Sequence, residues 1–239
     1  MWLPGMRSRE LDLERYDTDK EASGYLLRYD AILGHLVDRE VRLLELGINT
    51  GGSLLFWRDY FLSGTIVGVD LHLPDGLAEA ERVHVFQGSQ DDTRFLSEVA
   101  NKTAPKGFDV IIDDASHVGR LTQIAFWHLF DNHLKPGGIY AIEDWGTGYW
   151  HDWPDGRALR QPSRLRPFWH RVSSGLFPGA KARWPSHAYG MVGFLKQLID
   201  EQGIADALKR GKKGVASGRS KFESMLIAPG IAFITKNSP

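Results

Sequence analysis

Acidic side chains follow two apolar runs that have the composition of buried strands. Asp113 and Asp114 end the run at 108–114, and Glu143 and Asp144 end the run at 138–144. The carboxyl ends of neighbouring parallel strands meet at one edge of a sheet. Because clustered carboxylates repel one another unless a cation lies between them, Asp114, Glu143 and Asp144 are predicted to bind a metal ion. Oxygen ligands in a chain without cysteine favour Mg²⁺, with Mn²⁺ or Ca²⁺ as alternatives.

Two conditions apply to this prediction. Adjacent residues on a regular strand point to opposite faces, so Glu143 and Asp144 can converge only if the strand ends there, as the following Trp145 and Gly146 allow. Strand-end acids also cap helices. His117, three residues after Asp114, is predicted as a general base, and the alternative is a hydrogen-bonded structural histidine.

A second group of polar residues predicts a nucleotide-type pocket beside the first. Gly47, Gly51 and Gly52 follow the run at 41–47 and permit close approach of a ligand, although they do not form a GxGxxG pattern. Asp70 ends the run at 65–71, where an acid can accept both ribose hydroxyls. Ser89 and Gln90 follow the run at 82–88 and could contact an adenine. Packing alone, or helix capping, would also explain these residues.

The elements that must position these residues alternate along the chain. Five strand-like runs (41–47, 65–71, 82–88, 108–114 and 138–144) alternate with segments of helical spacing, such as Leu54, Trp57 and Phe61. A helix is predicted over about 189–208. Two more strand runs, 222–228 and 231–236, surround Pro229-Gly230 and predict an antiparallel hairpin. The predicted fold class is therefore α/β: a Rossmann-like, doubly wound, seven-stranded sheet, mostly parallel, with a C-terminal antiparallel hairpin.

The 239 residues predict a single domain over 1–239, with an N-terminal helical or cap segment at 1–40 and a lid-like insertion at 146–187. Five of the eight tryptophans lie between Trp145 and Trp184, in a stretch rich in basic residues and without a clear period. A lid or substrate-recognition role is weighed against an oligomer contact or a cover for the sheet edge. The basic stretch at 209–221 is interpreted as a solvated loop, with anion binding as the alternative.

Composition excludes several classes of protein. A formal net charge of −1 makes nucleic acid an unexpected partner, and the absence of cysteine excludes thiol and cysteine-metal chemistry. The sequence shows no apolar run long enough for a membrane helix and no secretory signal, so no membrane partner and a cytoplasmic location are expected.

The residues now described resemble those of class I S-adenosylmethionine-dependent methyltransferases, over about residues 16–144. The closer resemblance is to metal-dependent sugar and natural-product O-methyltransferases of the mycinamicin sugar methyltransferase type, with a looser likeness to cephalosporin-hydroxylase-like proteins. The resemblance is carried by Asp17-Thr18-Asp19-Lys20, Glu45-Leu46-Gly47, Gln87-Gly88-Ser89-Gln90, Asp113-Asp114-Ala115-Ser116-His117 and Glu143-Asp144.

The resemblance implies a role for each matching residue. Glu45 and Gly47 would line the methionine part of S-adenosylmethionine, Asp70 would hold the ribose, and Asp113 would face the cofactor. Near the adenine would lie Ser89 and Gln90, and the cofactor site would be closed by Thr18, Asp19 and Lys20. The metal would be held by Asp114, Glu143 and Asp144, with His117 as base. This sequence departs from the family at Asp17, where glycine is usual, and at Ser89, where aspartate is usual.

The resulting hypothesis is an S-adenosylmethionine-dependent, Mg²⁺-dependent O-methyltransferase that acts on a hydroxyl of a small-molecule acceptor, a sugar or natural product. The alternatives are a catechol-type O-methyltransferase and a non-catalytic S-adenosylmethionine-binding protein. A nicotinamide oxidoreductase is disfavoured by the missing GxGxxG, and a nucleic-acid methyltransferase by the local character of the basic stretches. The family resemblance favours a homo-oligomer. The sequence does not specify the acceptor or its regiochemistry.

Overall fold

The chain forms a seven-stranded sheet with the strand order β3-β2-β1-β4-β5-β7-β6. The computed structural model describes residues 6–74, 76–77, 80–159, 188–209 and 220–238. The strands are β1 (Arg42–Leu46), β2 (Thr65–Asp70), β3 (Val83–Gln87), β4 (Phe108–Asp113), β5 (Leu134–Glu143), β6 (Phe222–Ala228) and β7 (Ile231–Lys236). β1 to β5 pair in parallel, and β7 is antiparallel to both β5 and β6. The predicted fold class is confirmed.

The fifth strand begins earlier than the sequence predicts. The sequence analysis predicts a strand run at 138–144, but β5 starts at Leu134 and contains the Lys135-Pro136-Gly137-Gly138 stretch. The register against β4 steps from Leu134 opposite Phe108 to Ile139 opposite Val110, so the extra residues form an irregularity within the strand. Proline and glycine are tolerated in strands at such bulges, where ladder hydrogen bonds are interrupted.

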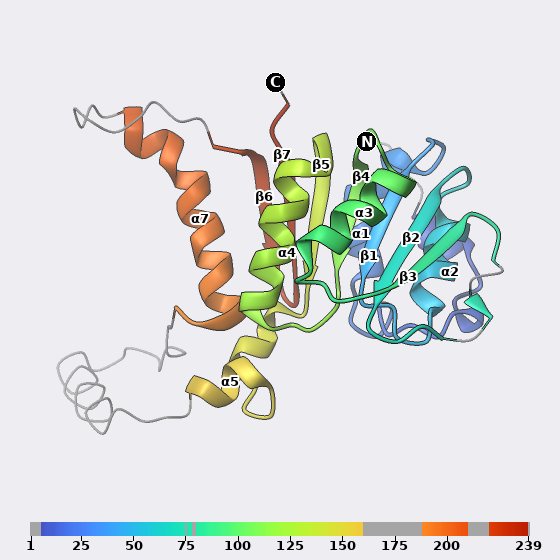
Figure 1. Ribbon diagram of the computed structural model, residues 1–239, viewed down its shortest axis with the longest axis horizontal. Helices are drawn as coiled ribbons and strands as arrows, with labels where there is room; N and C mark the ends of the chain where they lie inside the picture. Colours follow the sequence, from blue (N-terminus) through green and yellow to red (C-terminus); the bar gives the residue numbers. More distant parts are fainter. Residues whose placement is uncertain (1–5, 75, 78–79, 160–187, 210–219, 239) are drawn as a thin grey trace.

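Helices cover both faces of the sheet. One core contains residues of α1 (Leu26–Leu33) and α2 (Gly52–Tyr60), such as Tyr29 and Trp57. The other contains residues of α3 (Thr93–Thr103), α4 (Gly119–Asn132) and α7 (Gly190–Lys209), such as Leu96, Phe126 and Phe194. In Figure 1, α3 and α4 lie in front of the sheet, and α7 lies at its left end. The arrangement is doubly wound, as predicted from alternating strand and helix patterns.

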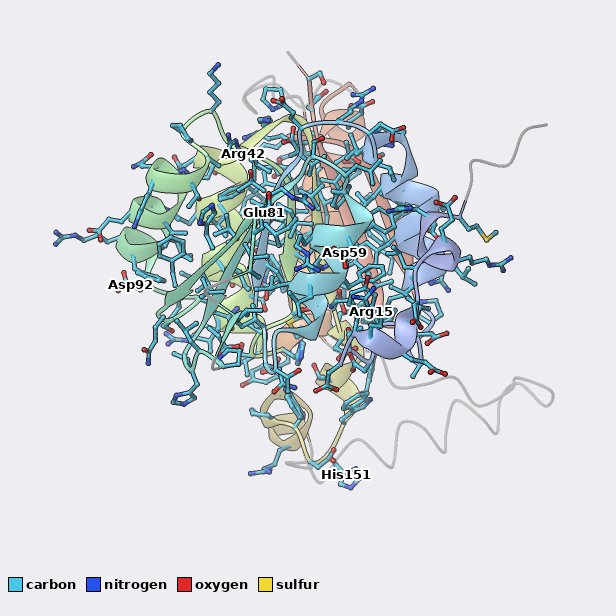
Figure 2. The ribbon with its side chains drawn as sticks, turned by 90° about the vertical axis from the view of Figure 1, so that its right-hand side faces the viewer. Arg15, Arg42, Asp59, Glu81, Asp92 and His151 are labelled. Atoms are coloured by element: carbon cyan, nitrogen blue, oxygen red, sulfur yellow. The ribbon has the colours of Figure 1, made fainter. Side chains whose placement is uncertain are left out.

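The segment before β1 packs along α2. It contains η1 (Arg7–Glu10), η2 (Leu13–Arg15), α1 and η3 (Gly34–Leu36). The Tyr16 hydroxyl donates to Asp59 Oδ2 at 2.8 Å, and the Tyr60 hydroxyl donates to Asp30 Oδ1 at 3.0 Å. Figure 2 shows Arg15 and Asp59 on neighbouring elements of this side. These contacts fix the N-terminal segment against α2.

The chain after β5 turns below the sheet edge through η5 (Trp145–Tyr149) and α5 (Pro154–Leu159) (Figure 1). Buried Asp155 joins three elements, because its Oδ2 accepts hydrogen bonds from Gly119 N and Met191 N, each at 2.8 Å. Much of the predicted lid-like insertion, 160–187, lies outside the described residues, as do Trp169, Trp184 and 210–219 of the basic stretch. Among the described helices, none combines the length and apolar character needed to cross a bilayer.

Two histidines lie near the amino-terminal end of β5, away from the acidic strand ends. Ser97 Oγ lies 2.8 Å from His128 Nε2 and 3.0 Å from His133 Nε2. Burial lowers the pKa of both imidazoles. The folded protein therefore favours neutral rings at this position.

This burial predicts acid destabilisation that originates at the histidine pair. As the pH falls below about 6.5, the unfolded chain takes up protons more readily than the folded one, so stability is present above that pH and lost below it. We expect the melting temperature of His128→Gln/His133→Gln to fall less between pH 7.5 and 5.5 than that of the unsubstituted protein. His84→Gln, at an exposed position, is the control. Parallel melting curves for all three proteins would contradict the prediction.

Candidate active site

A cavity of about 550 Å³ lies at the carboxyl ends of the five parallel strands. Nine of the residues to which the resemblance assigns a role line it: Thr18, Asp19, Gly47, Asp70, Ser89, Gln90, Asp114, His117 and Asp144. The other four predicted residues are not among the lining residues and are at most 1% exposed: Lys20, Glu45, Asp113 and Glu143. The structure therefore gathers all thirteen at one edge of the sheet, in two layers.

The cavity is acidic. Five aspartates line it: Asp17, Asp19, Asp70, Asp114 and Asp144. No lysine or arginine occurs among the described residues that line it. Such a wall attracts cationic ligands and repels polyphosphates. The electrostatics therefore favour a ligand that carries positive charge.

The loop from β1 to α2 forms one wall of the cavity and requires glycine at its start. Gly47 has a φ of +82°, and a Cβ atom there would collide with the backbone of Asp114 and Ala115. Asp70 Oδ2 accepts from Ile48 N at 2.8 Å and from Asn49 N at 3.2 Å, which fixes the loop against β2. Asp70 thus shapes the wall of the cavity, and its contact with a ribose stays a prediction.

A polar bridge joins the strand ends of β3 and β4. Gln90 donates to Asp113 Oδ1 at 3.3 Å and accepts from Ser116 N at 3.0 Å. Burial raises the pKa of Asp113 to about 6, against the opposing effect of His117. Ser89 donates to Asp91, and Asp92 caps α3 by accepting from Phe95 N at 3.0 Å (Figure 2). Helix capping, the alternative considered for this loop, is thus the role of Asp92 rather than of Ser89 or Asp91.

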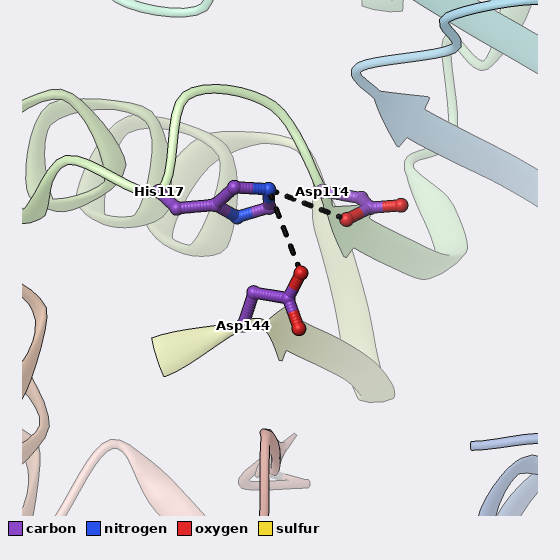
Figure 3. A group of neighbouring side chains, drawn as sticks. All are labelled: Asp114, His117 and Asp144. Carbon is purple, nitrogen blue, oxygen red and sulfur yellow. Dashed lines mark ion pairs between the residues drawn. The ribbon is translucent and has the colours of Figure 1, made fainter. Parts of the chain in front are cut away.

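Asp114, His117 and Asp144 all line the cavity, and their side chains face one another (Figure 3). His117 Nε2 lies 3.7 Å from Asp114 Oδ1 and 3.8 Å from Asp144 Oδ2, and one ligand atom from each residue lies within 4.8 Å of the others. His117 and Asp144 both have a φ of 50°, in the left-handed region. Such backbone geometry in residues other than glycine is often found at functional sites.

Glu143 is not one of these three residues. β5 ends at Glu143, and the left-handed turn at Asp144 separates the two carboxylates. Glu143 Oε1 accepts from Lys20 Nζ at 2.7 Å and from the Tyr29 hydroxyl at 2.5 Å. Glu143 is therefore oriented from beneath the cavity, by bonds that both reach the same carboxylate oxygen.

The Lys20 ammonium is buried among three carboxylates. Its Nζ lies 2.8 Å from Asp114 Oδ2, 2.7 Å from Glu143 Oε1 and 3.3 Å from Glu45 Oε1. Burial alone would lower the pKa of Lys20, but the negative charges of Glu143, Asp114 and Glu45 outweigh it and raise the pKa well above its ordinary value. Burial raises the pKa of Glu45 and of Glu143, and Lys20 opposes both shifts. Lys20 thus connects residues with two predicted roles. The resemblance assigns Glu45 to the cofactor, and it assigns Asp114 and Glu143 to the metal.

Sequence reasoning missed two tyrosines of this site. The Tyr25 hydroxyl donates to Asp144 Oδ1 at 2.5 Å, and the Tyr29 hydroxyl contacts Glu143 as described. The four-residue spacing of these tyrosines places both side chains on one face of a helix. That spacing was visible in the sequence, but nothing in it indicated that the face would meet the end of β5.

The loop that carries His117 is held by residues of η5 and its surroundings. Thr147 Oγ1 donates to the carbonyl oxygen of His117 at 3.1 Å, and Trp153 Nε1 donates to that of Ser116 at 3.2 Å. The Trp153 ring lies 5.9 Å from the His117 ring, centroid to centroid. This first part of the predicted lid-like insertion therefore supports the histidine loop.

The sheet order, the acidic cavity and the glycine loop define the Rossmann-like fold of class I methyltransferases. The solved structure of MycE methyltransferase from the mycinamycin biosynthetic pathway, in complex with Mg, SAH and mycinamycin VI, matches with a TM-score of 0.68. The sequence identity is 28%, and the match covers 97% of this chain and 56% of that chain. No protein-family model matches the chain.

Curated relatives are sugar O-methyltransferases of antibiotic pathways. The chain is 46% identical over 128 residues to 8-demethyl-8-(2-methoxy-alpha-L-rhamnosyl)-tetracenomycin-C 3'-O-methyltransferase of Streptomyces olivaceus, over 51% of this chain and 32% of the relative. It is 36% identical over 163 residues to mycinamicin VI 2''-O-methyltransferase of Micromonospora griseorubida, over 62% of this chain and 39% of the relative. The chain thus spans well under two thirds of the length of these relatives. The resemblance to metal-dependent sugar O-methyltransferases is confirmed.

The close approach at Gly47 gives a test of the site's architecture. Because an added methyl group would meet the Asp114 backbone at a positive φ, we expect Gly47→Ala to lower the free energy of unfolding by about 2–4 kcal/mol. Urea denaturation measures this difference. Gly146→Ala is the matched control, since a Cβ there meets nothing within 4 Å. Equal stability of the two variants would contradict the described packing.

Proposed function

We propose that this chain carries out S-adenosylmethionine-dependent methylation of a hydroxyl group on a small molecule, with Mg²⁺ or another divalent cation bound at the strand ends. The acceptor class that we propose is a sugar of a natural product, as the names of the relatives suggest. The chain spans only part of the length of those relatives, so their activity comes to this chain as a proposal.

The acidic wall of the cavity is the observation that carries the proposal. S-adenosylmethionine has a sulfonium and an ammonium group, whereas a nicotinamide dinucleotide has a pyrophosphate. Five aspartates, and the lack of lysine and arginine among the described lining residues, suit the first ligand and disfavour the second. The solved MycE structure contains the related ligand SAH.

The ligand atoms of the residues that face one another in the cavity fit a divalent cation. Asp114 and Asp144 each direct one oxygen toward the same point, and Glu143 lies directly before Asp144 at the end of β5. Carboxylate oxygens are the ligands that Mg²⁺ prefers, whereas imidazole suits zinc and copper better. We therefore assign Asp114 and Asp144 to the cation on their geometry and Glu143 on the family resemblance, and we keep His117 as the base.

The bound groups would supply a methyl group activated by positive charge and a cation that lowers the pKa of the acceptor hydroxyl. His117 Nε2, held between the carboxylates of Asp114 and Asp144, would take the hydroxyl proton. Thr147 and Trp153 hold the histidine loop in place during this transfer.

A small-molecule acceptor, a homo-oligomer and a cytoplasmic location remain predictions, and nucleic acid is not expected as a partner.

Calorimetric titration with S-adenosylhomocysteine and with Mg²⁺ tests both ligands separately. We expect the unsubstituted protein to bind both, and Asp114→Asn to bind S-adenosylhomocysteine but to lose Mg²⁺ binding at least tenfold. Asp109→Asn, which removes a carboxylate paired with Lys135 away from the cavity, is the matched control. If the unsubstituted protein does not bind S-adenosylhomocysteine, the proposal is overturned. If Asp114→Asn binds Mg²⁺ as tightly as the unsubstituted protein does, the cation assignment is overturned.

A second variant separates the base from a ligand role for His117. Because a base is needed for the chemistry and not for cation binding, we expect His117→Ala to bind Mg²⁺ and S-adenosylhomocysteine as the unsubstituted protein does. Methyl transfer to a glycoside acceptor that the unsubstituted protein methylates should fall by at least 10²-fold. Weakened Mg²⁺ binding by His117→Ala would instead make the imidazole a ligand.

A further inference from the structure

Three buried donors from one short segment reach three different carboxylates at the strand ends. Lys20 is 0% exposed, Tyr25 5% and Tyr29 0%. Lys20 contacts Asp114 Oδ2 and Glu143 Oε1, Tyr29 contacts Glu143 Oε1, and Tyr25 contacts Asp144 Oδ1. Each carboxylate is thus held through one of its two oxygens.

Two of the oxygens that remain approach the imidazole of His117. Asp114 Oδ1 and Asp144 Oδ2 approach His117, whereas their partner oxygens, Oδ2 and Oδ1, are held by Lys20 and Tyr25. A carboxylate rotates freely about its last bond unless one oxygen is fixed. Hydrogen bonds to the far oxygen therefore decide which oxygen a cation meets.

We propose that Lys20, Tyr25 and Tyr29 are positioning residues that present the carboxylates of Asp114, Glu143 and Asp144 to the divalent cation. This inference rests on the proposed function, because it concerns the same cation site. The residues do not contact the cation themselves. They act from the N-terminal segment, which the resemblance had assigned only to closing the cofactor site.

The C-terminal hairpin supports the same device. A Cβ at Gly230, in the turn between β6 and β7, would collide with the Tyr25 hydroxyl. The same turn binds the residue after Asp144, because Trp145 N donates to Gly230 O at 3.3 Å and Trp145 Nε1 donates to Ala228 O at 3.0 Å. The hairpin turn therefore contacts Tyr25 itself and Trp145, the residue that follows Asp144.

The chain contains matched tyrosine–aspartate pairs outside the cation site. Tyr16 donates to Asp59, and Tyr60 donates to Asp30, with both tyrosines buried as Tyr25 and Tyr29 are. Loss of any one of these hydroxyls removes a single hydrogen bond to a carboxylate. Only the loss of Tyr25 or Tyr29 would alter a carboxylate assigned to the cation.

The test compares four single-hydroxyl variants of the whole chain: Tyr25→Phe, Tyr29→Phe, Tyr16→Phe and Tyr60→Phe. The affinities for Mn²⁺ and Mg²⁺ are measured by calorimetry, with melting temperature and S-adenosylhomocysteine affinity as separate readouts. We expect Tyr25→Phe and Tyr29→Phe to bind the cation about 10–100-fold more weakly. The cation affinities of Tyr16→Phe and Tyr60→Phe should match that of the unsubstituted protein, even where their melting temperatures fall equally. Lys20 is not substituted, because its removal would leave the carboxylates of three residues without the ammonium group that they share.

Each result decides the matter. Weaker cation binding in the first pair and not in the second supports the proposal, whatever the melting temperatures show. Equal cation affinity in all four variants, with cation binding by the unsubstituted protein intact, overturns the positioning role and leaves the proposed function standing. Absence of cation binding by the unsubstituted protein overturns the cation assignment of the proposed function and this inference with it.

Discussion

The buried ammonium of Lys20 is the interaction on which the candidate site depends. It lies within 3.3 Å of carboxylates from the ends of β1, β4 and β5. Charges removed from water are costly, and breaking such a group by removing one partner costs about 3–5 kcal/mol. The ends of β1, β4 and β5 can carry neighbouring carboxylates because the Lys20 ammonium of the N-terminal segment lies between them.

This arrangement makes the N-terminal segment part of the site rather than a cover for it. Beside the contacts of Lys20, Tyr25 donates a hydrogen bond to Asp144, and Tyr29 donates one to Glu143. Thr147 and Trp153 act in the same way on the loop that carries His117. Segments that precede β1 and follow β5 thus converge on the same few side chains, and the cavity between them is bordered by the glycine loop and Asp70.

Strand positions were predictable because their signal is local. Apolar runs rich in branched residues, bounded by glycine and polar residues, placed β6 and β7 at the observed bounds and β1 to β4 within a residue at each end. β5 was misjudged at its start because proline and glycine normally interrupt a strand, whereas here the interruption is absorbed as a bulge beside β4. General rules of chain connection limit the order in which such strands can pair to a few possibilities, and the observed seven-stranded order is one of them.

The sequence by itself determined which residues reach the functional edge of the sheet, because the carboxyl ends of parallel strands meet there. It did not determine which of them face the cavity. Glu143 and Asp144 are adjacent in sequence, yet a left-handed turn directs one toward Lys20 and Tyr29 and the other toward His117. Only the tertiary structure decided this division, because it depends on partners more than a hundred residues away along the chain.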